Sequence, residues 1–221
     1  MLSAYTQNEK GLIASSEAIE KLATLNHARI LLISDSHGNS KKFETIVRQY
    51  GAKCNALVFC GDGAVDLANL LSKSFYDEEL KALIPPVIAF ARGNGDPATY
   101  PVNDKFSLKI PNSQILCVNH QNILIVHGHR QSVDFSMENL GLEMQISDCK
   151  TAFYGHTHIA SEEIQGEYKF VNPGSCSFPR GGQCPSFAIA TVENTFIDIA
   201  FIKMILKTDG SYSYEFWTPP F

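Results

Sequence analysis

Apolar runs of strand length recur along this chain, and polar residues end each of them. Residues 30–33 form the first run and stop before Asp35, and residues 56–60 form the second and stop before Asp62. Between the two runs, residues 43–50 place apolar side chains at helical spacing. An unbroken apolar run is typical of a strand buried on both faces, and a strand, a helix and a second strand in this order form a βαβ unit. The sequence therefore predicts an α/β fold with a parallel sheet.

Further segments continue this pattern, and no linker rich in proline, glycine or serine and no internal repeat divides them. We therefore predict a single domain over residues 29–221. The segment before it, residues 1–28, places Ile19, Leu22 and Leu25 at helical spacing, which predicts an N-terminal helical extension. The remaining expected elements are helical segments within residues 66–83 and 132–146, strands at residues 86–90, 151–154, 187–192 and 196–202, and a hairpin over residues 114–126.

Composition and charge exclude several classes of protein. The 221 residues are 44% apolar and 19% charged, so the chain can build a sizeable core and is not disordered. Its formal net charge is −5, so it lacks the basic character typical of proteins that track a nucleic-acid backbone, and a duplex nucleic-acid partner is not expected. The six cysteines form no CxxC pair, so a zinc-finger site is not expected either.

One stretch of the chain is long enough to suggest a membrane span. Residues 110–129 carry no formal charge, but Pro111, Asn119 and Asn122 are among several residues that would place unsatisfied polar groups in the bilayer. We interpret this stretch as a β-hairpin and expect no membrane partner. Residues 1–10 lack the basic start and the apolar run of a secretory signal, so a cytoplasmic location is expected. The sequence leaves a homo-oligomer open.

Five of the seven histidines fall into three short segments that follow predicted strands, namely His37, His127 with His129, and His156 with His158. In open α/β sheets, ligands bind in the crevice beyond the carboxyl ends of the strands. The position of these segments therefore favours a binding site. The two other histidines lie outside the segments and are interpreted as ordinary residues.

Polar residues at the strand ends offer oxygen and imidazole donors, which suit Mn, Fe, Zn, Co or Ni. Residues two apart in an extended segment can point the same way, so Asp35 and His37 could bind one ion, whereas His156 and His158 could divide between two. Taken alone, each residue has a more ordinary explanation as a turn, a helix cap or a satisfied core residue. Their occurrence at five strand ends argues against coincidence. The candidate donors are Asp35, His37, Asp62, Asn94, His127, His156 and His158.

Five short motifs and one closing signature occur in order between residues 30 and 190. They are Ser-Asp-Ser-His-Gly-Asn at 34–39, Gly-Asp-Gly at 61–63, Gly-Asn-Gly-Asp at 93–96, His-Gly-His at 127–129, Gly-His-Thr-His at 155–158, and Asn-Pro-Gly-Ser at 172–175 followed by Pro179 and Arg180. No single motif is specific, but together they resemble the motifs of the calcineurin-like metallophosphoesterases. Within that family, the set is most similar to the small bacterial and archaeal phosphodiesterase branch.

The resemblance implies a four-layer α-β-β-α sandwich with mixed sheets and a dinuclear metal site at the carboxyl ends of the strands. It also implies two divalent metal ions, with manganese expected first and Fe, Zn, Co or Ni as alternatives. Carried over position by position, it assigns Asp35, His37, Asp62 and His158 to the first metal, with Asp62 bridging to a second metal that is completed by Asn94, His127 and His156.

Further roles are expected close to the metals. His129 could orient the substrate or donate a proton, and Asp96 is a second candidate proton donor. Asn94 is expected to bind substrate as well as metal, and Arg180 could contact phosphate, although an ordinary surface charge explains it equally well. Many relatives have a histidine after Gly-Asn in the third motif, which they use as a general acid, and the closer branch often has a cysteine there. Gly95 provides neither side chain.

The activity implied is hydrolysis of small phosphodiesters, cyclic nucleotides among them, by attack of a metal-bridging hydroxide on phosphorus. Two alternatives stay open. The same metals could serve a phosphomonoesterase that acts on nucleotides or phosphoproteins. The chain could instead be a non-catalytic interaction module similar to the retromer sorting subunit, which shares this fold but has lost part of its metal set. All seven ligand positions are filled here, which argues against that reading.

Overall fold

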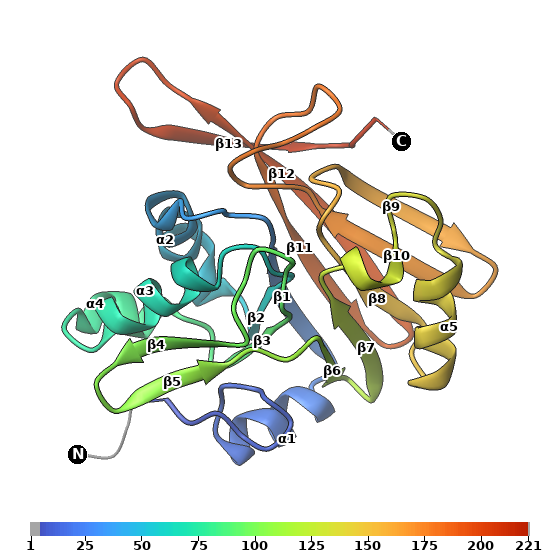
Figure 1. Ribbon diagram of the computed structural model, residues 1–221, viewed down its shortest axis with the longest axis horizontal. Helices are drawn as coiled ribbons and strands as arrows, with labels where there is room; N and C mark the ends of the chain where they lie inside the picture. Colours follow the sequence, from blue (N-terminus) through green and yellow to red (C-terminus); the bar gives the residue numbers. More distant parts are fainter. Residues whose placement is uncertain (1–4, 221) are drawn as a thin grey trace.

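Two stacked β-sheets form the centre of the protein. The computed structural model describes residues 5–220 (Figure 1). One sheet has six strands in the order β13-β12-β11-β1-β2-β3, and the other has five in the order β6-β7-β8-β10-β9. The six-stranded sheet contains β1 (His27–Ile33), β2 (Ala56–Phe59), β3 (Val87–Phe90), β11 (Ser186–Glu193), β12 (Phe196–Leu206) and β13 (Tyr212–Trp217). The five-stranded sheet contains β6 (Ser113–Val118), β7 (Gln121–Val126), β8 (Thr151–Phe153), β9 (Ala160–Gln165) and β10 (Tyr168–Pro173).

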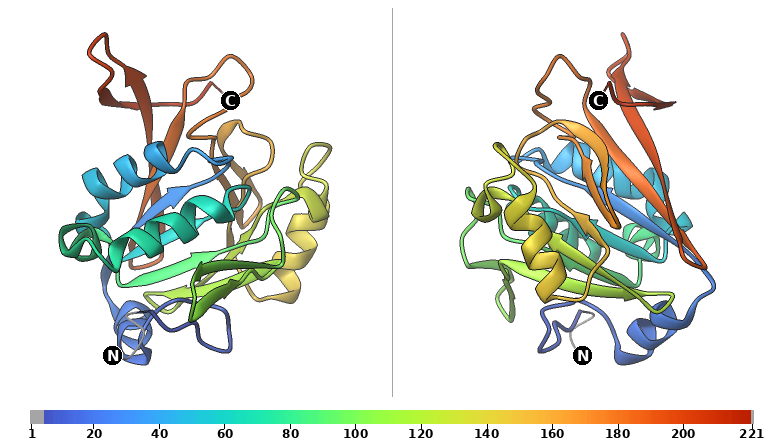
Figure 2. Two further views of the ribbon diagram at one scale, coloured as in Figure 1. Left: turned by 60° about the vertical axis from the view of Figure 1, so that its left-hand side comes forward. Right: turned by 90° about the vertical axis from the view of Figure 1, so that its right-hand side faces the viewer.

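Helices cover the outer faces of both sheets, with α2 and α3 on one side of the molecule and α5 on the other (Figure 2). Alternate strand residues divide between two cores: Leu31 and Leu57 pack toward α2 and α3, whereas Ile30 and Val58 pack between the sheets. The four-layer α-β-β-α sandwich is confirmed. The helices are α1 (Ser16–Thr24), α2 (Ser40–Tyr50), α3 (Ala64–Ser74), α4 (Glu78–Leu83) and α5 (Glu138–Ile146), with short 3₁₀ turns η1 (Gly51–Lys53) and η2 (His129–Gln131).

Both main sheets are mixed, with parallel strands at one end of the six-stranded sheet and at the centre of the five-stranded sheet. β1, β2 and β3 are parallel and β11 runs antiparallel to β1, while β8 lies between the parallel strands β7 and β10. Ile33, Phe59 and Phe90 are aligned across β1, β2 and β3. Because these three strands end at the same level, the loops that follow them leave the sheet side by side.

The uncharged stretch over residues 110–129 contains β6 and β7, which pair antiparallel as a hairpin. This confirms the interpretation made from the sequence. Among residues 5–220, no helix has the length and apolar character required to cross a membrane.

The N-terminal segment lies along the free edge of the six-stranded sheet. Ile13 exchanges two backbone hydrogen bonds of 3.0 Å with Ile88 of β3. Its side chain is only 2% exposed and belongs to the core beneath α2 and α3, and Leu22 of α1 joins the core between the sheets. The segment predicted as a helical extension therefore contains one helix and also covers an otherwise unpaired strand edge.

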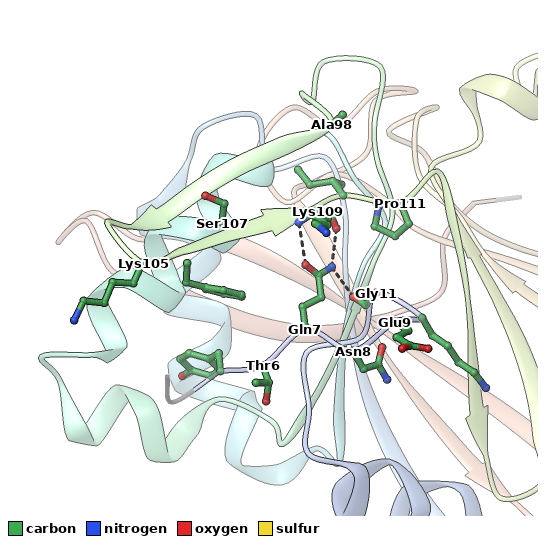
Figure 3. A pocket seen from close by; sticks show the side chains of 14 residues that line it. Thr6, Gln7, Asn8, Glu9, Gly11, Ala98, Lys105, Ser107, Lys109 and Pro111 are labelled. Atoms are coloured by element: carbon green, nitrogen blue, oxygen red, sulfur yellow. Dashed lines mark hydrogen bonds between the residues drawn. The ribbon is translucent and has the colours of Figure 1, made fainter. Parts of the chain in front are cut away.

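A groove of about 660 Å³ separates the N-terminal segment from the small hairpin of β4 (Thr99–Asn103) and β5 (Phe106–Lys109). Figure 3 shows the Gln7 side chain in this groove. Its amide accepts a hydrogen bond from the backbone N–H of Lys109 and donates to the carbonyl groups of Lys109 and Gly11. No predicted metal ligand lines the groove. We attribute it to the docking of the N-terminal segment rather than to the predicted site.

Replacement of Ile13 by alanine is expected to lower the free energy of unfolding by about 2–4 kcal/mol, because a buried aliphatic side chain leaves a cavity. Urea denaturation would measure this loss. Ile146→Ala, at a position that is 86% exposed, is the control and should change stability by less than about 0.5 kcal/mol. Equal, small losses in both variants would show that the N-terminal segment does not contribute to the folded core.

Candidate metal centre

Five loops carry the predicted ligands, and these loops follow strands of both sheets. Backbone hydrogen bonds join neighbouring loops: the N–H of Asp35 donates to Gly61 over 3.0 Å, and the N–H of Gly155 donates to His127 over 2.9 Å. Contacts between loops of different sheets, from the His156 N–H to Asp35 Oδ2 and between His127 Nδ1 and the Cys60 carbonyl, place the site where the carboxyl ends of the two sheets meet. In chain order, the loops carry Asp35 and His37 after β1, Asp62 after β2, Asn94 after β3, His127 after β7, and His156 and His158 after β8.

The backbone in these loops is unusual. A left-handed conformation in a residue other than glycine is uncommon and costs energy that the surrounding structure must offset. Such residues gather at functional sites. Positive φ angles occur at five of the seven predicted ligands, namely Asp35 (52°), His37 (47°), Asp62 (55°), His156 (70°) and His158 (60°).

Asp35, His37 and His158 form the first group of donors. His158 Nε2 lies 3.0 Å from His37 Nε2 and 3.3 Å from Asp35 Oδ1. Asp35 Oδ2 accepts hydrogen bonds from the Ser34 hydroxyl and the His156 N–H, but Oδ1 is buried without a hydrogen-bond partner. Burial lowers the pKa of His158, but the negative charge of Asp35 and the hydrogen bond to the Phe178 carbonyl raise it by more, so the net shift is upward. This environment attracts positive charge.

Asp62 lies between this group and a second one. Its Oδ1 accepts a hydrogen bond of 2.7 Å from the backbone N–H of Gly95. Its Oδ2 is 3.7 Å from His37 Nε2 and 3.6 Å from His127 Nε2. Asn94 Oδ1 is 3.2 Å from the same nitrogen of His127. A single carboxylate oxygen therefore faces imidazole nitrogens of both groups, as a bridging ligand would.

Two of the imidazole rings are oriented by backbone carbonyl groups. The Cys60 carbonyl lies 2.7 Å from His127 Nδ1, and the Phe178 carbonyl lies 2.6 Å from His158 Nδ1. A carbonyl oxygen can only accept, so each Nδ1 carries the proton and each Nε2 presents its lone pair to the centre. This arrangement is typical of histidine ligands of metals.

His156 is placed at the side of the cluster. Its ring centroid is 5.1 Å from that of His127, and its Nε2 lies 2.6 Å from Asp134 Oδ2. Sequence reasoning missed Asp134, because it lies within a segment predicted to be helical and outside every motif.

Asp96 holds the loops that carry Asp62 and Asn94. Its two carboxylate oxygens accept hydrogen bonds of 2.8–3.0 Å from the backbone N–H groups of Asp62, Gly63, Ala64 and Gly93. The side chain is 7% exposed. Both oxygens of Asp96 are therefore occupied by N–H donors of these loops, and its role as a proton donor stays a prediction.

A second buried carboxylate, Asp66 of α3, holds the loop after β1. It accepts hydrogen bonds from the hydroxyl groups of Ser36 and Ser40 and from the backbone N–H of Gly38. These residues surround His37 in sequence. From the sequence, only the place of Asp66 in the first turn of a predicted helix was visible, which does not indicate this role.

His129 and Arg180 lie near the donors but outside the two groups. The His129 ring is 5.3 Å from that of His127, and its Nδ1 is buried without a hydrogen-bond partner. Burial lowers the pKa of His129, and the neighbouring His127 and His156 lower it further. Arg180 is exposed, and its backbone N–H donates to the carbonyl of His158.

Two glycines of the third motif have different spatial constraints. A Cβ atom at Gly93 would lie 2.0 Å from Asp62 Oδ1, so a side chain cannot fit there. A Cβ atom at Gly95 would lie 3.2 Å from the same oxygen, so a side chain there would face the bridging carboxylate. The chain therefore has room for a side chain beside Asp62 at Gly95 and carries none there.

The donor set fits divalent metal ions. Two groups of acidic and histidine side chains have ligand atoms within 4.8 Å of one another, Asp35 with His37 and His158, and Asp35 with Asp62 and His127. Carboxylate oxygens and imidazole nitrogens without thiolates suit Mn, Fe, Zn, Co or Ni. The buried Oδ1 of Asp35, which accepts no hydrogen bond, would be satisfied by a cation.

Comparison with known proteins gives one family. Residues 29–195 match the family model described as the calcineurin-like phosphoesterase superfamily domain. The chain is 31% identical over 169 residues to phosphodiesterase YfcE of Escherichia coli strain K12, which covers 73% of this chain and 86% of that protein.

Solved structures share the fold. A predicted phosphoesterase from Streptococcus pneumoniae TIGR4 has a TM-score of 0.65 at 23% identity and covers 88% of this chain and 99% of its own. Vacuolar Protein Sorting 29 from Cryptosporidium parvum has a TM-score of 0.63 at 18% identity, with coverages of 87% and 98%. At these identities, structural similarity establishes the fold and not the activity.

Proposed function

Because the chain belongs to the calcineurin-like phosphoesterase superfamily, we propose that it is a divalent-metal-dependent phosphodiesterase that hydrolyses small phosphodiesters. The position of Asp62 carries this proposal. Its Oδ2 lies between His37 Nε2 and His127 Nε2, at 3.7 Å and 3.6 Å. Two metal ions that share this oxygen would form a centre suited to displacement at phosphorus.

When bound, two divalent ions about 4 Å apart lower the pKa of a water molecule and offset the charge of the phosphoryl oxygens. Two divalent ions carry four positive charges, whereas Asp35 and Asp62 supply only two negative charges and Asn94 is neutral. The site therefore keeps a positive charge that attracts a phosphoester. His37, Asn94 and Gly95 are exposed, which leaves the centre open to a substrate from solvent.

The remaining assignments are part of the same proposal. Manganese is our first choice among Mn, Fe, Zn, Co and Ni, all of which suit nitrogen and oxygen donors without sulfur, because the family resemblance implies it first. His129 is assigned to orientation of the substrate, and Arg180 is a candidate phosphate contact because it follows Phe178 on the rim of the site. The six cysteines, all within residues 5–220, are free thiols, which fits a reducing, cytoplasmic location.

A non-catalytic interaction module stays the alternative, because Vacuolar Protein Sorting 29 shares this fold and a fold does not by itself imply an enzyme. Two features favour the enzyme: all seven ligand positions are filled, and the donor atoms of five of them converge around Asp35, whose buried Oδ1 accepts no hydrogen bond.

Hydrolysis assays test the proposed reaction. Metal-free protein is supplied with Mn²⁺ and offered an aryl phosphodiester and the matching aryl monoester, in parallel with His156→Ala. We expect metal-dependent turnover with a preference for the diester, and a large loss of turnover in the variant. A preference for the monoester would support the phosphomonoesterase alternative, and absence of turnover of both esters would support the interaction module.

Leaving-group dependence is a further prediction for the unsubstituted enzyme. Without a side chain at Gly95, and with Asp96 bound to four N–H groups, the site has no evident acid to protonate a departing alkoxide. Aryl phosphodiesters should therefore react much faster than alkyl diesters, by a factor on the order of the 10²–10⁴ that general acids contribute. Equal rates for aryl and alkyl diesters would contradict this prediction.

Introduction of a proton donor provides the matched comparison. Gly95→His places an imidazole next to Asp62, and the backbone at Gly95 does not require glycine, since no left-handed φ occurs there. We expect the ratio of aryl to alkyl rates to fall by about tenfold or more.

A further inference from the structure

The geometry points to Asp134 as the positioning residue of His156, and through it of the second metal ion. This inference rests on the proposed function, since it concerns the same site. Asp134 lies in no motif, and its carboxylate Oδ2 is 2.6 Å from His156 Nε2.

His156 differs from the other two buried or half-buried histidine donors in how its ring is held. His127 and His158 are each fixed through Nδ1 by a backbone carbonyl, so each presents Nε2 to the centre. In His156 it is Nε2 that faces a partner. The nitrogen left for a metal is therefore Nδ1, and the proton belongs on Nε2 beside the carboxylate.

The backbone of His156 is fixed, but its ring depends on Asp134. The His156 N–H donates to Asp35 Oδ2 over 3.1 Å, and its φ angle is 70°. These features set the position of Cα but not the rotamer of the ring, which lies beside the rings of His127 and His129 at centroid distances of 5.1 Å and 6.1 Å. Within residues 5–220, Asp134 is the one ion-pair partner of this ring.

The backbone conformation of the loop places Asp134 beside His156. Gly128 and Ser132 both have left-handed backbone conformations, with φ angles of 113° and 57°. The N–H of Val133 donates to the Gly128 carbonyl, and the Val133 side chain is buried in the core under α5. With Val133 anchored in this way, the next residue, Asp134, reaches the surface beside His156.

A role in stability alone is a weak explanation for this pair. The Asp134 side chain is 42% exposed and that of His156 is 22% exposed, and exposed ion pairs contribute little to folding. A carboxylate behind a metal-binding histidine has a different effect: it fixes the tautomer and raises the basicity of the ring, and its loss typically costs 10- to 100-fold in metal affinity.

Calorimetric titration of metal-free protein with Mn²⁺ tests the inference. We expect Asp134→Ala to weaken binding of one of the two equivalents by about 10- to 100-fold and to leave the other unchanged. Asp134→Asn, which keeps an acceptor oxygen but loses the charge, should give a smaller loss. Asp148→Asn removes one exposed acidic charge that follows α5 and should bind both equivalents like the unsubstituted protein.

A second readout requires neither metal nor activity. Long-range ¹H–¹⁵N spectra of the metal-free protein should show His156 with its proton on Nε2. In Asp134→Ala this preference should be lost, while His127 and His158 keep their protons on Nδ1.

The outcomes separate this inference from the proposed function. If Asp134→Ala binds two equivalents of Mn²⁺ with unchanged affinity and an unchanged tautomer, the role of Asp134 is overturned while the metal centre stands. If the unsubstituted protein takes up no Mn²⁺, the proposed function fails, and the inference fails with it.

Discussion

Asp62→Asn is expected to weaken metal binding at both positions and to reduce phosphodiester hydrolysis by about 10²–10³-fold. The asparagine can still accept the N–H of Gly95 through an oxygen, so the loop should keep its shape. It cannot supply the negative charge that holds two cations close together. The loss corresponds to about 3–4 kcal/mol of transition-state stabilisation, at 1.36 kcal/mol for each factor of ten.

The measurement is the number of Mn²⁺ ions bound after dialysis, determined by elemental analysis beside the hydrolysis rate. Asp148→Asn serves as the charge control. Retention of two tightly bound ions in Asp62→Asn would show that this carboxylate does not bridge them, and the assignment of the two positions would have to be revised.

Asp96→Ala is expected to lower the free energy of unfolding by at least about 3 kcal/mol. It removes the acceptor of four backbone N–H groups at a nearly buried position, and each buried donor left unsatisfied costs about 1–3 kcal/mol. Because two of these groups belong to Asp62 and Gly93, the bridging carboxylate should also move and metal affinity should fall. Chemical denaturation and Mn²⁺ titration would measure the two effects.

The asparagine variant distinguishes a structural role from a catalytic one. An amide offers a single acceptor oxygen where the carboxylate offers two, so Asp96→Asn should also lose stability. If Asp96 were instead the proton donor, Asp96→Asn would keep the stability of the unsubstituted protein and would lose activity selectively on alkyl diesters, which have poor leaving groups.

Much of the fold follows from local sequence pattern. The apolar runs at β1, β2 and β3 predicted a parallel sheet, and these strands are parallel. The division of helices and strands into four layers came from the family resemblance, because no local pattern says which sheet a strand joins. The pairing of Ile13 with Ile88 could not be predicted from local sequence either, because it depends on a strand edge that exists only in the folded protein.

Two helices differ from the prediction for identifiable reasons. The helical segment expected within residues 66–83 is divided into α3 and α4, because Asp77 caps α4 by accepting the N–H of Leu80 and also pairs with Arg48 of α2. The helix expected within residues 132–146 begins only at Glu138. Before it, left-handed Ser132 directs the chain toward the metal centre.

The candidate ligands could be selected from the sequence because strand ends and motifs share positions along the chain. The residues that support them could not, since their roles depend on contacts between distant loops. Asp66 reaches Ser36 across 30 positions, and Asp134 reaches His156 across a strand and a helix. Their residue types are common in turns and helix ends, so the sequence offered no reason to prefer a role in the site.

Turnover during metal titration is the most direct test of a two-metal phosphodiesterase. Metal-free protein is titrated with Mn²⁺ while hydrolysis of an aryl phosphodiester is followed. We predict that the rate rises as the second equivalent binds, and that a chelator abolishes it. Hydrolysis that persists in the chelator, or a protein that holds two Mn²⁺ ions and hydrolyses no phosphoester, would contradict the account.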